Sequence, residues 1–129
     1  MALCVSWSKP IVTIRIHTLT ERTLHHSVYV IELPLAVAED RKFLKQNPHY
    51  VTGQTCLYVG MTGKTPEERY QQHASGHKKA ARPFKKYGVV ALRKDLYEGI
   101  NPLTYEDACS LEIKHADSLK CKGYGVWQN

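Results

Sequence analysis

The sequence predicts a single α+β domain, in which short strands are combined with helices. Its 129 residues suffice for one modest core, because folding hides roughly two-thirds of the surface of a chain of this length. Short apolar runs rich in strand-forming residues occur at 11–19, 27–33, 55–60 and 89–96. Between and after these runs, several segments carry helix formers or helix start signals.

The first strand, IVTIRIHTL at 11–19, alternates polar and apolar side chains, which is typical of a strand with one solvent-exposed face. The second, SVYVIEL at 27–33, ends at Pro34. Residues 36–46, AVAEDRKFLKQ, are rich in helix formers and stop before an Asn-Pro pair, so they predict a helix. The third strand, TCLYVG at 55–60, is expected to lead through Gly60 into a turn.

The helix after this turn has the best-defined start in the chain. Thr65 is the expected N-cap, Pro66 the first helical residue, and Glu68 lies three residues past the cap, which is a capping box. Gly76 is expected to end the helix. A basic segment at 77–88 then leads to the last predicted strand at 89–96.

The last predicted helix runs from the N-cap Thr104 to Gly123 and contains an unusual carboxylate. Glu112 falls in the middle of the apolar face, which comprises Tyr105, Ala108, Cys109, Ala116 and Leu119. A carboxylate in such a place loses hydration and needs a cation or hydrogen-bond donors. Two interpretations stay open: a buried ion pair with a neighbouring Arg or Lys, or a functional carboxylate.

Four further polar side chains allow both a structural and a functional interpretation. Tyr29 and Tyr58 each lie inside an apolar strand, where a buried hydroxyl requires a partner. Arg69 and His73 are four residues apart and therefore point to the same side of their helix. Taken singly, the tyrosines are typical core residues and the helical pair is typical of a surface.

Four segments follow one another along the chain: Ser27-Val28-Tyr29, Tyr58-Val59-Gly60, Arg69-x-x-x-His73 and a late Glu112. In this order they resemble the motifs of the GIY-YIG endonuclease superfamily. The resemblance extends from about residue 27 to the C-terminus. It implies one domain over 1–129, with a small antiparallel sheet of three strands flanked by helices. Residues 1–26 are then an N-terminal extension whose strand adds an edge to the sheet, and residues 34–54 a helical insertion between the two tyrosine strands.

The chain departs from the family pattern in two further places. Ser27 stands where the first motif usually has glycine. The family also carries an asparagine after the glutamate helix, and the candidate here is the final residue, Asn129. An inactive module of the same fold that binds nucleic acid, or a protein-interaction domain, therefore stays an alternative.

The resemblance implies metal-dependent hydrolysis of phosphodiester bonds, with Tyr29, Tyr58, Arg69, His73 and Glu112 at one concave site. Glu112 would bind one Mg²⁺ or Mn²⁺ ion, and Arg69 would clamp phosphate oxygens. Tyr29 would take a proton from water and His73 would relay it, while Tyr58 would orient water or phosphate; the two tyrosines could exchange roles. A phenol with an ordinary pKa near 10 requires neighbours that favour its phenolate form.

The charge of the chain fits a nucleic-acid partner. Its net charge is +6 and its pI about 9.2, which favours binding to a polyanion, with DNA preferred over RNA as the expectation. The expected phosphate contacts are Lys64, Lys78, Lys79, Arg82, Lys85 and Lys86. Target choice would come from the domain's own loops, from a homodimer or from a separate targeting protein. With no apolar run of spanning length and no secretory signal, we expect no membrane association and a cytoplasmic location.

Overall fold

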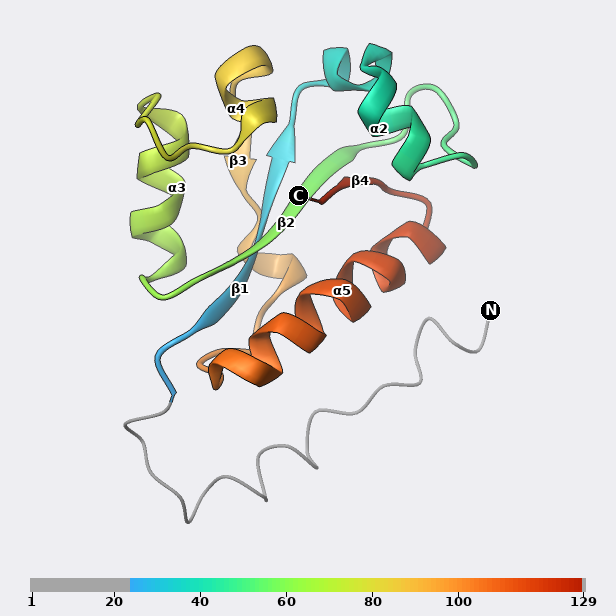
Figure 1. Cartoon of the computed structure of the whole chain (residues 1–129). Coiled ribbons are helices and arrows are strands. Elements are labelled where there is room, and N and C mark those ends of the chain that lie inside the picture. Colours follow the sequence, from blue (N-terminus) through green and yellow to red (C-terminus); the bar gives the residue numbers. More distant parts are fainter. Residues whose placement is uncertain (1–23, 129) are drawn as a thin grey trace.

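A four-stranded sheet forms the centre of the computed structural model, which describes residues 24–128 (Figure 1). Strands β1 (Ser27–Leu33) and β2 (Cys56–Thr62) are antiparallel along their full length. On the outer sides, β3 (Ala91–Leu92) pairs antiparallel with β1, and β4 (Gly125–Trp127) pairs parallel with β2. The α+β class is therefore confirmed, but the sheet is mixed, and the expected strand at 11–19 lies outside the described residues.

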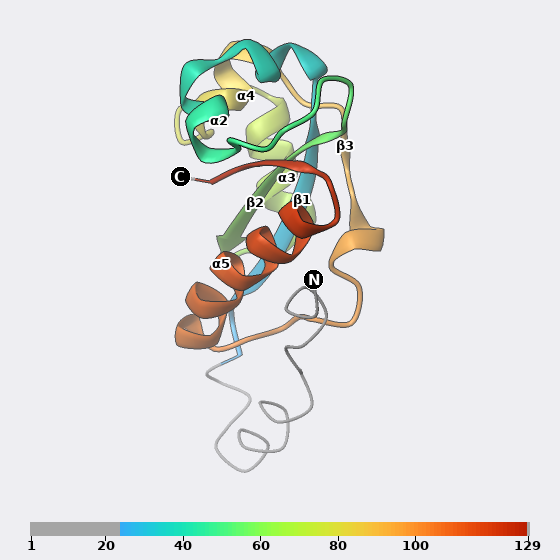
Figure 2. The same ribbon diagram turned by 90° about the vertical axis from the view of Figure 1, so that its right-hand side faces the viewer.

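Helices cover both faces of this sheet. Helices α3 (Pro66–Ala74) and α4 (Arg82–Tyr87) lie on one side, and the long helix α5 (Tyr105–Cys121) lies on the other, as the two perpendicular views show (Figures 1 and 2). No helix between residues 24 and 128 is both long and apolar enough to cross a lipid bilayer.

The two predicted helix starts are confirmed, and their caps explain why these helices begin where they do. The Thr65 side chain accepts from the Glu68 amide while the Glu68 carboxylate accepts from the Thr65 amide, which completes the capping box of α3. Thr104 caps α5 by accepting from the Asp107 amide. Tyr105 does not join the core, however: it is 55% exposed and packs edge-on against His26.

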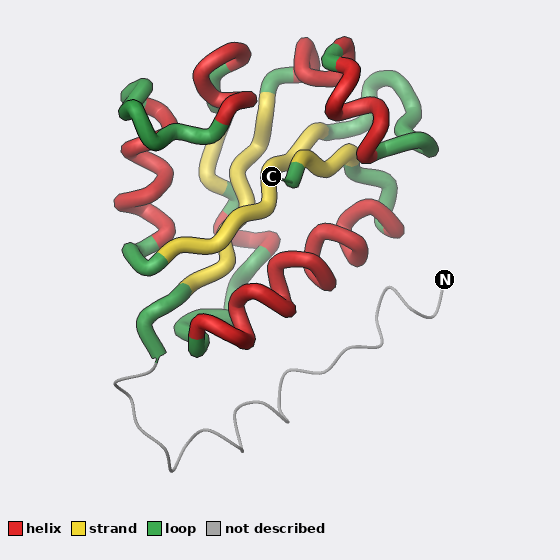
Figure 3. The backbone as a smooth tube through the Cα atoms, viewed as in Figure 1, coloured by secondary structure: helices red, strands yellow, loops and turns green. Residues whose placement is uncertain are grey.

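The predicted helix at 36–46 is divided into two short helices (Figure 3). The 3-10 helix η3 (Leu35–Glu39) ends at Asp40, whose backbone is extended. The Asp40 side chain then caps α2 (Arg41–Gln46) by accepting from the Lys42 amide at 2.9 Å. Because aspartate is a much better N-cap than an interior helical residue, the chain restarts its helix here.

The insertion between β1 and β2 is joined firmly to the C-terminal strand. The side chain of Asn47 bonds both the amide and the carbonyl of Val126 at 2.8 Å, and so satisfies the outer edge of β4. Gly125 lets the insertion approach closely, because a Cβ there would lie 2.4 Å from the Phe43 ring and 2.7 Å from the Tyr50 ring. The insertion is thus part of the core and not an appendage.

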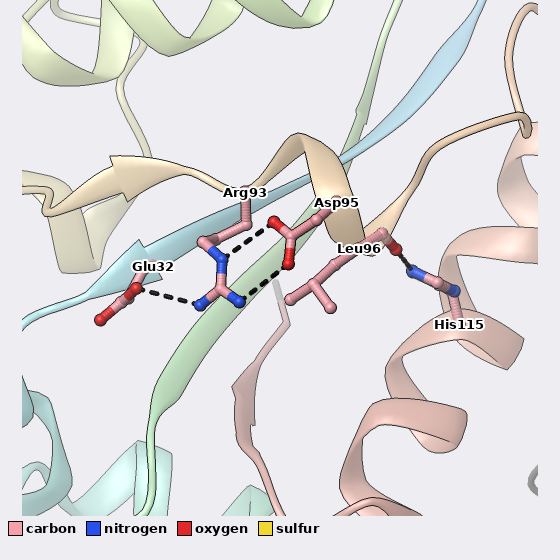
Figure 4. A network of polar contacts seen from close by, with 5 residues as sticks. All are labelled: Glu32, Arg93, Asp95, Leu96 and His115. Atoms are coloured by element: carbon pink, nitrogen blue, oxygen red, sulfur yellow. Dashed lines mark hydrogen bonds and ion pairs between the residues drawn. The ribbon is translucent and has the colours of Figure 1, made fainter.

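The strand predicted at 89–96 is shorter than expected, because the chain leaves the sheet at Arg93. The guanidinium of Arg93 bonds Glu32 on β1 and the carboxylate of Asp95, and the chain turns into the 3-10 helix η4 (Lys94–Leu96) (Figure 4). The Leu96 carbonyl lies 2.6 Å from His115 Nε2 on α5. Two elements were also missed by the sequence analysis: α4 within the basic segment, and β4.

Candidate active site

The two tyrosines stand side by side on the central strands. In the register of β1 and β2, Tyr29 lies opposite Gly60 and Ile31 opposite Tyr58, so both phenols project from the same face of the sheet. Their rings are nearly parallel, at an interplanar angle of 9° and a centroid distance of 6.1 Å. Both side chains are buried, with exposed fractions of 1% and 3%.

The sequence predicts a turn at Gly60, and this prediction is wrong. Gly60 lies inside β2. Its missing side chain makes room for the Tyr29 ring: a Cβ on Gly60 would lie 2.6 Å from Tyr29 Oη and 2.8 Å from Cζ. Side chains do not approach this closely. The glycine of the second motif therefore determines where the tyrosine of the first motif can lie.

His73 reaches Tyr29 from helix α3. Its Nε2 lies 3.0 Å from Tyr29 Oη, and its Nδ1 accepts the backbone amide of Ala81 at 3.2 Å. Because a backbone amide only donates, Nδ1 carries the lone pair and the neutral ring carries its proton on Nε2. His73 therefore donates its hydrogen bond to the Tyr29 oxygen. The Phe84 ring of α4 packs against the imidazole at a centroid distance of 4.2 Å.

Burial keeps Tyr29, Tyr58 and His73 uncharged at neutral pH. It lowers the pKa of His73 to about 4, and the nearby Arg69 charge acts in the same direction. Burial raises the pKa of Tyr29 to about 12, although Arg69 opposes this shift. The pKa of Tyr58 is also raised, first by burial and then by the neighbouring Tyr29. In the absence of a ligand, the site therefore contains two phenols and a neutral imidazole.

The pKa of His73 predicts an acid-sensitive fold. The unfolded histidine has a pKa near 6.5, so protonation favours the unfolded chain, and stability is lost as the pH falls from about 6.5 through about 4. The total loss from this residue should approach about 3 kcal/mol. Thermal unfolding between pH 7 and pH 4 measures it: the melting temperature of His73→Gln should depend less on pH than that of the wild type.

An exposed histidine supplies the control for this measurement. His49 lies on the surface of the insertion, so His49→Gln should keep the wild-type pH dependence. His115, whose pKa is lowered by its own burial, remains in both variants and leaves some acid sensitivity behind. A pH dependence of His73→Gln equal to that of the wild type would contradict the assignment.

Arg69 lies one helical turn before His73 and borders the phenols. Its Nη1 donates to Gln72 Oε1 at 2.8 Å and its Nη2 to the Lys79 carbonyl at 2.9 Å, so the guanidinium is held in place. Its positive charge lowers the pKa values of Tyr29 and His73. The sequence-based placement of Arg69 and His73 on one side of the helix, towards the tyrosines, agrees with this arrangement.

Glu112 approaches the same phenols from α5. Its negative charge acts on both Tyr29 and Tyr58, and raises the pKa of each. The side chain is half-buried, and burial raises the pKa of its carboxyl group. No residue between 24 and 128 forms a hydrogen bond or an ion pair with this carboxylate. The sequence left two interpretations of Glu112 open, a buried ion pair and a functional carboxylate. The described residues do not form the ion pair.

The edge of the sheet is open near these groups. Strand β4 pairs with β2 only from Cys56 to Tyr58, so β2 has no neighbour on that side from Val59 to Thr62 among the described residues. This unpaired stretch of β2 begins next to Tyr58 and contains Gly60, the residue opposite Tyr29.

An open hollow of about 630 Å³ adjoins Arg69. We call it the Arg69 hollow. Tyr29, Tyr58, His73 and Glu112 do not line it; the lining besides Arg69 comprises the predicted phosphate contacts Lys64, Lys78 and Lys79, together with Thr62, Gly63, Gln72 and His77. Gln72 and His77 were missed by the sequence analysis. The spacing Arg69-x-x-Gln72 places both side chains on one helix face and could have indicated the first of them.

The other predicted phosphate contacts, Arg82, Lys85 and Lys86, lie on α4 and do not line this hollow. Lys85 Nζ donates to the Lys78 carbonyl at 2.8 Å. Arg82 and Lys86 lie 3.8 and 3.6 Å from the carboxylate of Asp40, so these two charges are partly balanced within the chain. Asn129, the candidate asparagine, lies outside the described residues.

Fold and site together define a small α+β domain with a mixed sheet and a cluster of two buried phenols, a buried imidazole, and a half-buried guanidinium and carboxylate. No protein-family model matches this chain, and neither a curated protein nor a solved structure is significantly similar to it.

Proposed function

We propose that this chain is a nuclease of the GIY-YIG type, which hydrolyses phosphodiester bonds of nucleic acid, with DNA as the preferred substrate. The proposal depends on one observation above all. Glu112 acts electrostatically on the two stacked phenols, as Arg69 also does, and is half-buried without a hydrogen-bonding or ionic partner among residues 24–128. An unpaired, partly desolvated carboxylate is unfavourable for folding, and such groups are typical of functional sites.

The carboxylate of Glu112 suits a divalent cation such as Mg²⁺ or Mn²⁺. Between residues 24 and 128, no three or more His, Cys, Asp or Glu side chains are grouped so as to hold a metal ion by themselves. A cation on Glu112 would therefore complete its coordination with water and substrate oxygens, as Mg²⁺ commonly does. When bound, it would supply charge stabilisation for the phosphate and the leaving oxygen.

Arg69 is the group best placed to bind the scissile phosphate. Its two terminal nitrogens are oriented by Gln72 and Lys79, and the guanidinium borders the Arg69 hollow. A fork of donors with permanent charge matches two non-bridging phosphate oxygens. Because the guanidinium is already held in place before substrate arrives, little ordering is required when the negative charge develops.

Tyr29 would be the proton acceptor for the attacking water once its phenolate form is favoured. His73 donates to the phenol oxygen through Nε2, and this hydrogen bond becomes stronger when the oxygen is charged. We therefore assign His73 to stabilising the Tyr29 phenolate, in place of the proton relay inferred from the sequence. Tyr58, stacked beside it, would orient the water or the phosphate.

One observation favours a second candidate, a domain of this type that binds nucleic acid without cleaving it. Burial raises the pKa of both tyrosines, that of Tyr29 to about 12, so neither phenolate forms readily at neutral pH in the unbound protein. Salt-dependent binding of DNA without cleavage in the presence of Mg²⁺ or Mn²⁺ would support this alternative. Failure to bind any nucleic acid at low salt would instead support a protein-interaction domain.

A cleavage assay with Arg69 variants tests the proposal. Purified protein should nick or cut plasmid DNA with Mg²⁺ or Mn²⁺, and Arg69→Ala should reduce the rate by about a hundredfold to a thousandfold. Arg69→Lys keeps the charge but loses the fork, so it should recover only part of the activity. Lys114→Ala, at an exposed position on α5, is the control and should cleave as the wild type does. Wild-type activity in Arg69→Ala would refute the assignment.

A further inference from the structure

A second basic hollow lies between α4 and the insertion. We call it the insertion hollow; its volume is about 610 Å³, and its cations are Arg41, Lys42 and Lys45 from α2 and Arg82 and Lys86 from α4. Two carboxylates, Glu39 and Asp40, also line it. Five positive charges against two negative ones favour an anionic ligand.

We propose that the insertion hollow is a second phosphate-binding site for duplex DNA, and that the insertion between the tyrosine strands is a substrate-binding element. Its connection with cleavage depends on the function proposed above. Among residues 24–128, Arg41 and Lys45 are exposed and form neither an ion pair nor a side-chain hydrogen bond. Nothing in the described fold therefore requires their charges, which are available to a ligand.

Asp40 fixes the base of this hollow. Its carboxylate is almost fully buried, accepts from Tyr87 Oη and the Lys42 amide at 2.9 Å each, and lies within 4 Å of Arg82 and Lys86. Burial alone would raise the pKa of Asp40, but these donors and cations outweigh it and lower the pKa. The side chains of Arg82 and Lys86 stay more than half exposed, so Asp40 positions them without removing them from solvent.

The indole of Trp127 positions two of the same cations. Lys42 Nζ lies 5.9 Å and the Arg82 guanidinium 6.0 Å from the ring centroid, within the range of cation–π interaction. Trp127 is itself fully buried in β4. One cation from α2 and one from α4 are thus anchored to a rigid part of the core, which brings the two basic elements together at one end of the molecule (Figure 1).

The basic segment at 77–88 connects this hollow with the Arg69 hollow. Its first part contributes Lys78 and Lys79 to the Arg69 hollow, and its second part contributes Arg82 and Lys86 to the insertion hollow. The six residues of α4 extend about 9 Å at 1.5 Å per residue. Measured along the axis of a duplex, each strand carries one phosphate about every 3.4 Å, so two to three base pairs span this distance. A single DNA backbone could therefore contact both hollows.

Salt-dependent binding of the double variant Arg41→Gln/Lys45→Gln tests the proposal. The probe is a labelled DNA duplex of about 20 base pairs, or two helical turns, measured by fluorescence anisotropy from about 50 to 200 mM salt. If both charges touch phosphates, the slope of log K against log salt should become shallower by about 1.8, from 0.9 per contact. The control Lys114→Gln/Lys122→Gln removes the same charge from exposed positions elsewhere and should leave the slope unchanged.

The outcomes separate this proposal from the nuclease proposal. A shallower slope in the insertion variant but not in the control supports the second site. This holds even if the wild type fails to cut DNA, because that result contradicts only the nuclease assignment. An unchanged slope in the insertion variant overturns the second site, whether or not the protein cleaves. An equal change in both pairs also overturns it, because overall charge would then explain the binding.

Discussion

Glu112→Gln is expected to abolish DNA cleavage while leaving the fold at least as stable as that of the wild type. The substitution keeps the shape of the side chain but removes the charge that would bind the cation, so the rate should fall on the order of a thousandfold or more. Stability should not fall, because the wild-type carboxylate is half-buried without a partner among the described residues and is already unfavourable in the folded chain. The measurements are cleavage with Mg²⁺ or Mn²⁺ and thermal unfolding.

The difference in stability between Glu112→Gln and the wild type should also depend on pH, which gives a second measurement. Burial raises the pKa of Glu112 in the folded chain, so folding favours its protonated form, and stability is lost as the pH rises from the ordinary pKa of a glutamate through the raised pKa of the folded chain. The advantage of Glu112→Gln should therefore be small at acidic pH and larger at neutral pH. Asp117→Asn, at an exposed position on the same helix, should change neither activity nor stability. A Glu112→Gln protein that unfolds at lower temperature than the wild type would indicate a structural carboxylate.

Gly60→Ala is expected to impair both folding and cleavage. The new methyl group would lie 2.6 Å from Tyr29 Oη and 2.8 Å from Cζ, in a buried part of the sheet where β1 and β2 are paired along their full length. Such overpacking costs about 1–3 kcal/mol. Any displacement of the Tyr29 ring would also misplace the proton acceptor, and a shift of about 1 Å can reduce a rate about a hundredfold. Chemical denaturation and the cleavage assay measure the two effects.

Gly63→Ala is the matched control for this substitution. Three residues further along the chain, a Cβ would meet only His26 at 3.5 Å, which is an ordinary contact. A double-mutant cycle with Tyr29→Phe refines the test, because removing Oη removes the closest atom and should recover part of the lost stability. Because Gly63 lines the Arg69 hollow, Gly63→Ala is the reference for stability and the wild type is the reference for cleavage. If Gly60→Ala were as stable as Gly63→Ala and as active as the wild type, the close approach of glycine and tyrosine would not determine the geometry of the site.

Local signals in the sequence sufficed for the two best-defined helices and for the central strand pair. The capping box of Thr65 and Glu68 acts within one turn, and the apolar runs around Tyr29 and Tyr58 specify strands wherever they pack. The same signals failed at residues 36–46 and 89–96. At 36–46 the local cap of Asp40 on the Lys42 amide interrupts the helix, and Tyr87, far away in the sequence, bonds the same carboxylate. At 89–96 Arg93 bonds both the nearby Asp95 and the distant Glu32 where the chain leaves the sheet.

For the candidate site, the sequence by itself determined which residues could take part: two tyrosines in strands, an Arg and a His on one helical face, and an acid on an apolar face. Only the tertiary structure decided that Glu112 lacks an ionic partner among the described residues, that Gly60 admits the Tyr29 ring, and that His73 donates to Tyr29. The physical reason is the distance along the chain over which each kind of interaction acts. Caps and periodicity act between residues a few positions apart, whereas partners, burial and protonation depend on segments that meet only when the chain has folded.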